Sequence, residues 1–241
     1  MLSIIIPSLN EEKYLGLLLE SIKKQRFLNY EIILADAGST DKTLEIAKQY
    51  SCKIITGGLP AKGRNEGAKI AMGDFLFFCD ADVILPEDFF EKSLSEFKKR
   101  NLELASFGIT FIPKNIIKTA IINIFYNYPV KLLETTLPHA ATGILVKTDL
   151  FKKSGGFDED IKLSEDHSLA RYVQKQFKAK VGIIKSVNIF VSDRRFKTDG
   201  WFNIGLKYLF CELHLIFIGP VKSDIFKYKF GHYNNKPENK K

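Results

Sequence analysis

Cysteine is scarce in this chain: only three occur in 241 residues, at Cys52, Cys79 and Cys211. They lie far apart in the sequence and form no CxxC pair, so their spacing indicates neither a disulfide framework nor a cysteine-based zinc site. A reducing compartment suits such a chain, and we therefore expect a cytoplasmic protein.

Long uninterrupted hydrophobic runs are also missing. The opening LSIIIPS is too short for the apolar core of a signal peptide and stops at a proline. The best candidate for a membrane span, WFNIGLKYLFCELHLIFIG, is interrupted by Asn203, Lys207, Glu212 and His214, whereas spanning needs about 20 nearly uncharged apolar residues. We therefore expect neither a signal peptide nor a transmembrane helix.

The glycine-rich loops that bind phosphates in many nucleotide enzymes are absent as well. The chain contains no GxGxxG turn and no Walker sequence, so a metal ion would have to take the place of the loop amides beside any nucleotide diphosphate. A composition of 45% hydrophobic and 27% charged residues, without repeats, excludes a disordered chain. A chain of this length can bury one sizeable core.

Positive charge is unevenly distributed. The formal net charge is +8, and the segment from Val221 to the C-terminus carries six lysines and two acids, a net charge of +4. Such a tail suits anionic phosphate surfaces, either lipid or nucleic acid. Because it contains no arginine and no nucleic-acid-binding module is recognisable, we favour lipid and expect no nucleic-acid partner. A tail that only aids solubility is the alternative.

The first half of the chain alternates short β-type runs with helical patterns. The predicted strands are LSIIIPS, YEIILAD, CKIIT and GDFLFF, and the helical stretches between them are EKYLGLLLESIKKQ, DKTLEIAKQY and GRNEGAKIAM. This alternation predicts an α/β fold with a Rossmann-like, mostly parallel sheet and flanking helices. Ligands bind such sheets at the carboxyl ends of the strands, where residues 7–11, 36–41 and 80–82 form polar clusters.

Beyond Pro86 the chain elaborates this sheet. The expected elements are a helix in EDFFEKSLSEFKKR, strands in LELASFGITFI and ATGILVK, a helix over 164–177 and a strand in VGIIKSVNIFVS. In NIIKTAIINIFYNYP, polar residues recur every four positions opposite an apolar stripe, which predicts an amphipathic helix ended by Pro129. A last amphipathic helix runs from about Gly200 to Ile218. No long linker is present, so we expect one domain.

Two carboxylates follow a buried strand in the sequence FFCDADV. Asp80 and Asp82 point the same way if the extended backbone continues, and like charges so close repel unless a cation lies between them. A hard divalent cation, Mg²⁺ or Mn²⁺, would offset the charge of a nucleotide diphosphate as it leaves. For the pair alone, a solvated turn is the alternative.

Two further residues lie near the same predicted edge. In ADAGSTD, Ser39 or Thr40 with Asp41 is enough to cap the next helix, so Asp36 is not needed for the cap and is expected to bind a base or a ribose. Arg64, in GRNEG, supplies a guanidinium near that edge, with a surface helix residue as the alternative.

A transfer reaction also needs a base for the acceptor hydroxyl. The sequence LSEDHSLARYV places Glu165 and Asp166 at a helix start, with Ser164 as a candidate cap. Adjacent residues cannot face the same way on a helix, so we expect one acid to be the base and the other to be structural. His167 is expected to be a partner or a surface residue rather than the base.

The order of these motifs resembles that of the family-2 glycosyltransferases. IPSLNEE, DAGSTDKT, GRNEGAKIAMGDFLFFCDADV, TGILVKTDLFKKSGGFDEDIKLSED and SDRRF follow one another over residues 2–196. The resemblance implies a GT-A fold and an inverting transfer from a nucleotide-diphosphate sugar with Mg²⁺ or Mn²⁺. By position it implies Asp166 as the base, Asp80 and Asp82 as the DxD metal ligands, and a nucleotide-sugar site of Pro7, Glu11, Asp36, Arg64, Asp80 and Asp82.

Some features differ from those of larger family members. No QxxRW pattern and no long hydrophobic spans are present, so transfer of a single sugar is expected rather than polymer synthesis. The segment DRRF is similar to a basic element of small members, where Arg194 and Arg195 would bind a diphosphate or an acceptor phosphate; a surface pair is the alternative. We place the GT-A domain at 1–196, divided near residue 85 into nucleotide-binding and acceptor halves, and an amphipathic helix with a basic tail at 197–241.

Two helices, over 115–128 and 200–218, contain more apolar residues than one small core requires. They predict a protein peripheral on the cytoplasmic face of the membrane, acting on a polyprenyl-phosphate or glycolipid acceptor. Packing on the sheet, or on a second subunit in a homodimer, is the alternative. Two other functions stay open: a nucleotidyltransferase, although the loop after the first strand is not rich in glycine and lysine, and a non-catalytic nucleotide-sugar-binding module.

Overall fold

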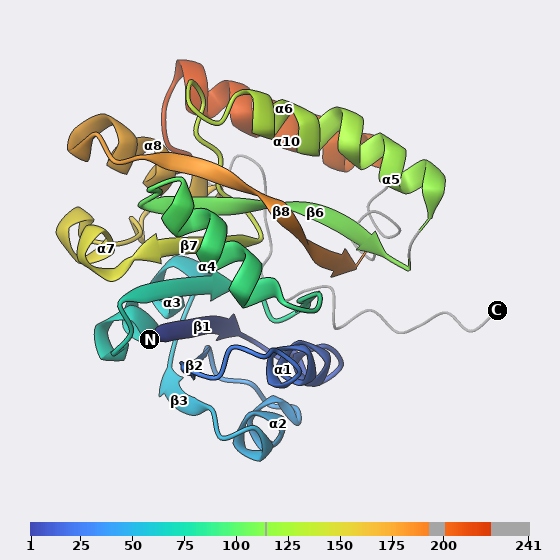
Figure 1. Ribbon diagram of the computed structural model, residues 1–241, viewed down its shortest axis with the longest axis vertical. Coiled ribbons are helices and arrows are strands. Elements are labelled where there is room, and N and C mark those ends of the chain that lie inside the picture. Colours follow the sequence, from blue (N-terminus) through green and yellow to red (C-terminus); the bar gives the residue numbers. More distant parts are fainter. Residues whose placement is uncertain (114, 193–200, 223–241) are drawn as a thin grey trace.

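The chain folds around one mixed β-sheet flanked by helices (Figure 1). The computed structural model describes residues 1–113, 115–192 and 201–222. The strands are β1 (Leu2–Ser8), β2 (Tyr30–Asp36), β3 (Lys53–Thr56), β4 (Phe75–Cys79), β5 (Val83–Ile84), β6 (Leu104–Ile112), β7 (Gly143–Lys147) and β8 (Val181–Ser192). The helices are α1 (Leu15–Lys23), α2 (Thr43–Gln49), α3 (Pro60–Ile70), α4 (Phe89–Lys99), α5 (Ile116–Ile122), η1 (Asn123–Asn127), α6 (Tyr128–Leu132), α7 (Thr148–Ser154), α8 (Glu165–Phe177) and α10 (Trp201–Phe217).

The strand order, within the described residues, is β3-β2-β1-β4-β7-β6-β8-β5. Strands β3, β2, β1 and β4 run parallel, β7 is antiparallel to both of its neighbours, and β6 and β8 are again parallel. The predicted α/β fold with a mostly parallel sheet is therefore confirmed. Its parallel half brings the carboxyl ends of β1, β2 and β4 to one edge, as expected.

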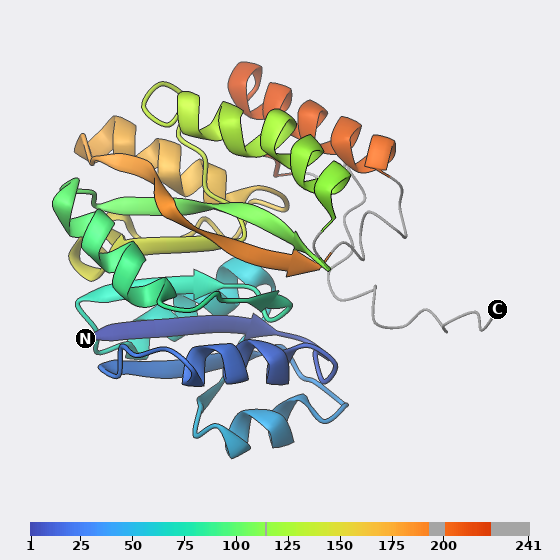
Figure 2. The ribbon, with the colours of Figure 1, turned by 45° about the vertical axis from the view of Figure 1, so that its right-hand side comes forward.

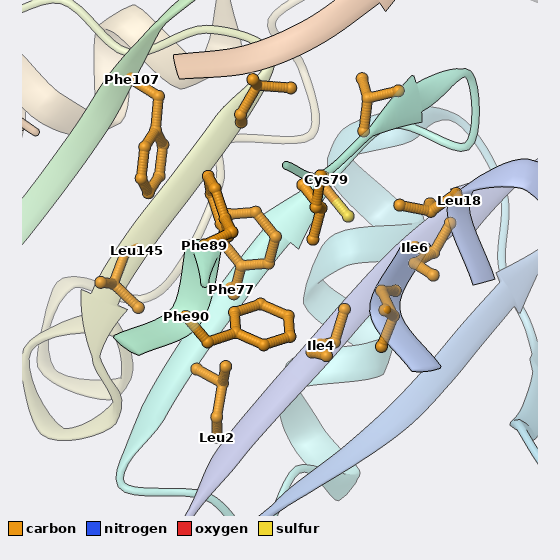
Figure 3. Close-up of a cluster of buried hydrophobic side chains, with 14 of the residues drawn as sticks. Leu2, Ile4, Ile6, Leu18, Phe77, Cys79, Phe89, Phe90, Phe107 and Leu145 are labelled. Carbon is orange, nitrogen blue, oxygen red and sulfur yellow. The ribbon is translucent and has the colours of Figure 1, made fainter. Parts of the chain in front are cut away.

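The central strands are buried on both faces. Leu2, Ile4 and Ile6 of β1 pack with Phe77 of β4 in one apolar cluster, whereas Ile5 belongs to a second cluster on the opposite face. Figure 3 shows the first cluster, which α1 and α4 cover. Helices α3, α7 and α8 cover the second. Two-sided burial explains why these strands have continuous apolar sequences without alternation.

The chain stays helical from Ile116 to Leu132, so the prediction that Pro129 ends this helix is wrong. Between α5 and α6 lies one π-helical turn, η1, in which the N–H of Tyr128 donates to the carbonyl of Asn123, five residues back. Pro129 then stands in the first turn of α6. Pro129 has no N–H to donate to the preceding turn, but it directly follows a π-helical turn, in which the regular α-helical hydrogen-bond pattern is already interrupted.

This helical segment turns its polar stripe inward. Asn127 is 1% exposed; its amide accepts from the N–H of Ile109 in β6 at 2.9 Å and donates to the Ile109 carbonyl at 2.8 Å and to Asn123 at 2.7 Å. Apolar side chains point outward instead, among them Phe125 and Leu132, which are 77% and 82% exposed. Asn127 and the buried Ile122 thus share the inner side of the segment, and apolar side chains also cover its outer side.

Helix α10 lies beside this segment in both views (Figures 1 and 2) and also exposes apolar side chains near its end. We define the apolar face as the following exposed apolar residues of the two helices and of the position directly after α10: Ile116, Ile117, Ile124, Phe125, Tyr128, Leu132, Phe210, Phe217 and Ile218. Ordinary packing of both helices on the sheet does not account for these residues, because they contact solvent. None of the helices in the described part of the chain has the length and hydropathy needed to cross a bilayer.

Two glycines of α3 test how closely this helix packs on β1. A Cβ atom at Gly67 would overlap Cγ2 of Ile5, whereas a Cβ at Gly63 would approach the Cβ of Pro7 no closer than 3.4 Å. We expect Gly67→Ala to lower the free energy of unfolding by about 1–3 kcal/mol through overpacking. Gly63→Ala is the matched control and should be neutral or stabilising, because alanine favours a helix over glycine by about 1 kcal/mol. Urea denaturation measures both, and equal stabilities would contradict this packing.

Candidate active site

The loops after β1 and β2 are joined by hydrogen bonds. The N–H of Asn10 donates to Oγ of Ser39 at 2.9 Å, and Oδ1 of Asn10 accepts from the N–H of Thr40 at 2.8 Å. The N–H of Glu11 donates to Oγ1 of Thr43 at 2.8 Å. These contacts hold the two loops as one corner of the sheet edge, the corner where Pro7, Glu11 and Asp36 were expected to surround a nucleotide.

Asp36, at the end of β2, is buried and binds its own turn. Oδ2 accepts from the backbone N–H groups of Gly38 and Ser39 at 2.9 and 2.8 Å, and Oδ1 accepts from the hydroxyls of Ser39 and Ser8 at 2.5 and 3.1 Å. These contacts stabilise the turn after β2, a role that the sequence did not indicate for Asp36. A ribose or base could bind Asp36 only by joining or displacing these four donors.

Neither expected hydroxyl cap forms. Helix α2 begins at Thr43, whose N–H and hydroxyl both donate to Oδ1 of Asp41 at 2.9 and 2.5 Å, so an acid takes the capping place predicted for Ser39 or Thr40. At α8, Ser164 makes no cap hydrogen bond. Its backbone is left-handed, with φ of 61°, whereas a capping serine needs an extended conformation.

The guanidinium of Arg64 joins the two acidic motifs. Arg64 is 7% exposed; its Nη2 lies 3.0 Å from Oδ1 of Asp80, and its Nη1 lies 2.5 Å from Oε1 of Glu165. Its Cζ also lies 5.4 Å from the ring centre of Phe157, a favourable place for a cation. Burial opposes the charge, but Glu165, Asp80 and Asp166 raise the pKa of Arg64 above its ordinary value. The alternative of a surface helix residue is wrong.

Asp80 and Asp82 lie between β4 and β5 at the same sheet edge. The Asp80 side chain is 39% exposed and Asp82 is half-buried, so both carboxylates can be reached from solvent. Mg²⁺ and Mn²⁺ prefer oxygen ligands, and a carboxylate pair with solvent access is a suitable donor set. These residues therefore fit the predicted divalent metal site.

The fold changes the protonation of Asp166. It lies in the first turn of α8, where its Oδ1 accepts from the N–H of His167 at 2.8 Å. Burial, and next the negative charge of Glu165, raise the pKa of Asp166 to about 7, against the opposing charge of Arg64. A carboxylate with a pKa near neutrality is well matched to proton transfer at that pH.

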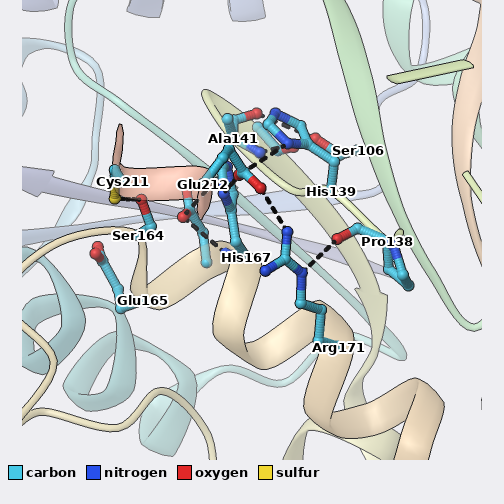
Figure 4. A network of polar contacts seen from close by, with 12 residues as sticks. Ser106, Pro138, His139, Ala141, Ser164, Glu165, His167, Arg171, Cys211 and Glu212 are labelled. Atoms are coloured by element: carbon cyan, nitrogen blue, oxygen red, sulfur yellow. Dashed lines mark hydrogen bonds and ion pairs between the residues drawn. The ribbon is translucent and has the colours of Figure 1, made fainter. Parts of the chain in front are cut away.

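A polar cluster beside Asp166 was not predicted from the sequence (Figure 4). Nδ1 of His167 lies 2.5 Å from Oε1 of Glu212 in α10, Nη2 of Arg171 lies 2.6 Å from Oε2 of Glu212, and the ring of His139 lies against that of His167. His167 is thus a partner of a charged residue, Glu212, rather than a surface residue, and these were the two alternatives expected for it. The sequence held two signals: Glu212 is the one acid in an apolar helix, and His167 and Arg171 stand four residues apart on α8.

The expected site residues divide into three groups. Arg64, Asp80 and Glu165 are in direct contact. Pro7, Glu11, Asp36, Asp82 and Asp166 lie at the ends of β1, β2 and β4 and at the start of α8. Arg194 and Arg195 lie outside the described residues.

Comparison with protein families and curated proteins gives concordant matches. Residues 3–153 match the model of Glycosyl transferase family 2. The Minor teichoic acid biosynthesis protein GgaB of Bacillus subtilis is 31% identical to this chain over 198 residues, which cover 76% of this chain and 22% of GgaB. The chain therefore spans less than a quarter of that relative's length.

Solved structures show the same fold. TarS 1–349 from S. aureus in complex with UDP-GlcNAc has a TM-score of 0.63 at 20% identity, covering 88% of this chain and 66% of that one. The mannosyltransferase PcManGT from Pyrobaculum calidifontis, in complex with GDP-Man and Mn²⁺, has a TM-score of 0.63 at 16% identity, covering 78% of this chain and 56% of that one.

Proposed function

The chain belongs to glycosyl transferase family 2, and we propose that it transfers a single sugar from a nucleotide-diphosphate sugar to an acceptor presented at a membrane surface. The predicted family and GT-A fold are confirmed. The observation that carries the proposal is the ion bridge of Arg64, because it holds Asp80 and Glu165 in one site. Donor activation and attack by the acceptor need such a shared site.

We assign the donor to the sheet edge between the loops after β1, β2 and β4. The similar structure of TarS contains UDP-GlcNAc, and that of PcManGT contains GDP-Man and Mn²⁺, which supports a nucleotide sugar and a divalent ion here. Asp80 and Asp82 would hold Mg²⁺ or Mn²⁺, and the proposed nucleotide-sugar contacts are Pro7, Glu11, Asp36 and Arg64. When bound, the ion supplies positive charge to the diphosphate leaving group.

Asp166 is our proposed base. With a hydroxyl acceptor, the acceptor oxygen bonds to the anomeric carbon while the bond from that carbon to the diphosphate oxygen breaks, and this displacement inverts the configuration. Asp166 takes the proton of the acceptor hydroxyl. Glu165 holds Arg64, so it serves as the structural acid of the pair. A phosphate acceptor is already ionised, and Asp166 would then orient it.

A lipid-linked acceptor is favoured by the apolar face. Its residues include Phe125 and Leu132, more than three-quarters exposed, on a helix whose asparagines point inward. Each large apolar side chain that leaves water fully contributes about 1.5–3 kcal/mol, so several inserted ones outweigh the roughly 1 kcal/mol that each lysine adds at an anionic surface. A polyprenyl phosphate or a glycolipid would present its acceptor group at that interface.

The chain divides into a catalytic part and a C-terminal part with different proposed roles. We propose 1–196 as the catalytic domain and 197–241 as the membrane-binding helix and tail, on the cytoplasmic face of the membrane. Arg194 and Arg195 would bind the donor diphosphate or the acceptor phosphate, since arginine matches phosphate geometry well.

Two substitutions separate metal binding from chemistry. We expect Asp82→Ala to lose Mn²⁺-dependent binding of UDP or GDP, because one carboxylate ligand is gone. Asp166→Asn should keep that binding and lower donor turnover by at least about 100-fold, the low end for removal of a general base. Calorimetric titration with and without Mn²⁺ measures the binding, and hydrolysis of UDP-GlcNAc or GDP-mannose measures turnover.

The control for both variants is Asp149→Asn, which changes an exposed acid of α7 and should alter neither quantity. Unchanged metal-dependent affinity in Asp82→Ala would refute the metal assignment. A larger loss of turnover in Glu165→Gln than in Asp166→Asn would move the base to Glu165.

Membrane association is tested by the double variant Phe125→Gln/Leu132→Gln. The protein should sediment with vesicles that contain phosphatidylglycerol, less so in high salt and less so when residues after 220 are deleted. The double variant should sediment several-fold less, because it removes two exposed apolar groups. Leu28→Gln, which changes a residue 78% exposed outside the apolar face, is the matched control. The membrane assignment would be contradicted if the wild-type protein stayed in the supernatant with and without vesicles. If the wild type were also a dimer and the double variant a monomer, the apolar face would be the contact with a second copy of the chain.

A further inference from the structure

We propose that His139, His167 and Glu212 form a metal site separate from the aspartate pair, which takes a divalent transition metal such as Zn²⁺ and ties the start of α8 to α10. One ligand atom from each residue lies within 4.8 Å of the others. This site goes beyond the proposed transfer reaction and does not require it. Two imidazoles and one carboxylate are a familiar zinc ligand set, with a fourth position left for water.

The ligands come from three separate segments (Figure 4). His139 precedes β7, His167 lies in the first turns of α8, and Glu212 lies in α10. Oε1 of Glu212 lies 2.5 Å from Nδ1 of His167 and 3.7 Å from Nδ1 of His139. Tetrahedral zinc with bonds near 2.05 Å places ligand atoms roughly 3.3 Å apart, so each of these two distances would change by less than about 1 Å on binding.

The outward atoms of two ligands are held by other residues. Nε2 of His139 lies 3.1 Å from the hydroxyl of Tyr126 in η1, and Oε2 of Glu212 lies 2.6 Å from Nη2 of Arg171. Metal-binding histidines and carboxylates almost always have such outer partners, which fix the tautomer and the orientation. The inner atoms, Nδ1 of His139 and Oε1 of Glu212, are thereby left to face His167.

Two of the proposed ligand atoms lack a well-formed hydrogen bond. Nδ1 of His167 and Oε1 of Glu212 are buried, and in the described part of the chain neither makes a hydrogen bond of normal geometry, although they lie close together. Buried polar atoms without a well-formed hydrogen bond are costly, and a cation between these two would satisfy both.

A bound metal would cross-link the fold at a useful place. His167 follows the proposed base Asp166, and Glu212 lies on the helix that contributes to the apolar face. The bound metal would hold Asp166 at a fixed position relative to the apolar face. Because the three segments are apart in an unfolded chain, metal binding should also raise thermal stability.

The test is titration of the chelator-treated full chain with Zn²⁺ alone, followed by calorimetry and by thermal unfolding. We expect one Zn²⁺ per chain and a higher Tm, with Co²⁺ giving the visible absorption of a tetrahedral site. His139→Ala should weaken binding by at least about 100-fold, and Tyr126→Phe, which keeps all three ligands, by about tenfold. His214→Ala is the matched control: this histidine binds the Gly219 carbonyl at 2.9 Å and should leave the Zn²⁺ affinity unchanged.

Asp82→Ala should also leave Zn²⁺ binding unchanged, which separates this site from the donor site whether or not the donor assignment holds. Absence of Zn²⁺ binding by the wild-type chain would overturn the proposal. Equal affinity in the wild type, His139→Ala and Tyr126→Phe would overturn it too, as would loss of the bound Zn²⁺ in Asp82→Ala alone.

Discussion

The buried guanidinium of Arg64 is the interaction on which the candidate site depends. A buried charge is tolerated only beside opposite charges, and Arg64 finds two, on Asp80 and on Glu165, which stand 16 and 101 residues further along the chain. It also limits the repulsion among Asp80, Glu165 and Asp166. Close packing of α3 on β1 fixes where Arg64 lies, so the position of one helix determines which acids can share the site.

Polar contacts on the inner sides of two helices connect the site with the apolar face. Asn127 binds the backbone of β6, and Glu212 of α10 contacts His167, the neighbour of Asp166. Both helices place some polar groups inward and expose apolar groups to solvent. A membrane-bound acceptor fits this arrangement, because the side chains that would meet the lipid and the proposed base belong to elements in direct contact.

The sequence predicted the backbone of the parallel half well, because strands buried on both faces leave continuous apolar runs; the predicted LSIIIPS and YEIILAD coincide with β1 and β2. The positions of Asp80 and Asp82 at a strand end followed from the same pattern. Contacts between side chains far apart in the sequence could not be predicted in this way, because no sequence pattern relates Arg64 to Glu165 or Glu212 to His167. The helix end at Pro129 was misjudged because a π-helical turn precedes it, and the hydrogen bonds of Asp36 with its own turn were not foreseen, since residue preferences specify neither.

A double-mutant cycle on the free energy of unfolding, with Arg64→Met and Glu165→Gln, tests the central claim most directly. The account predicts a coupling energy of about 1.5 kcal/mol or more, because this hydrogen-bonded ion pair is buried. The same cycle on Arg26 and Asp88, an ion pair of 3.5 Å in which the arginine side chain is 84% exposed, should give a value near zero. A coupling between Arg64 and Glu165 no larger than this control would contradict a site held together by Arg64.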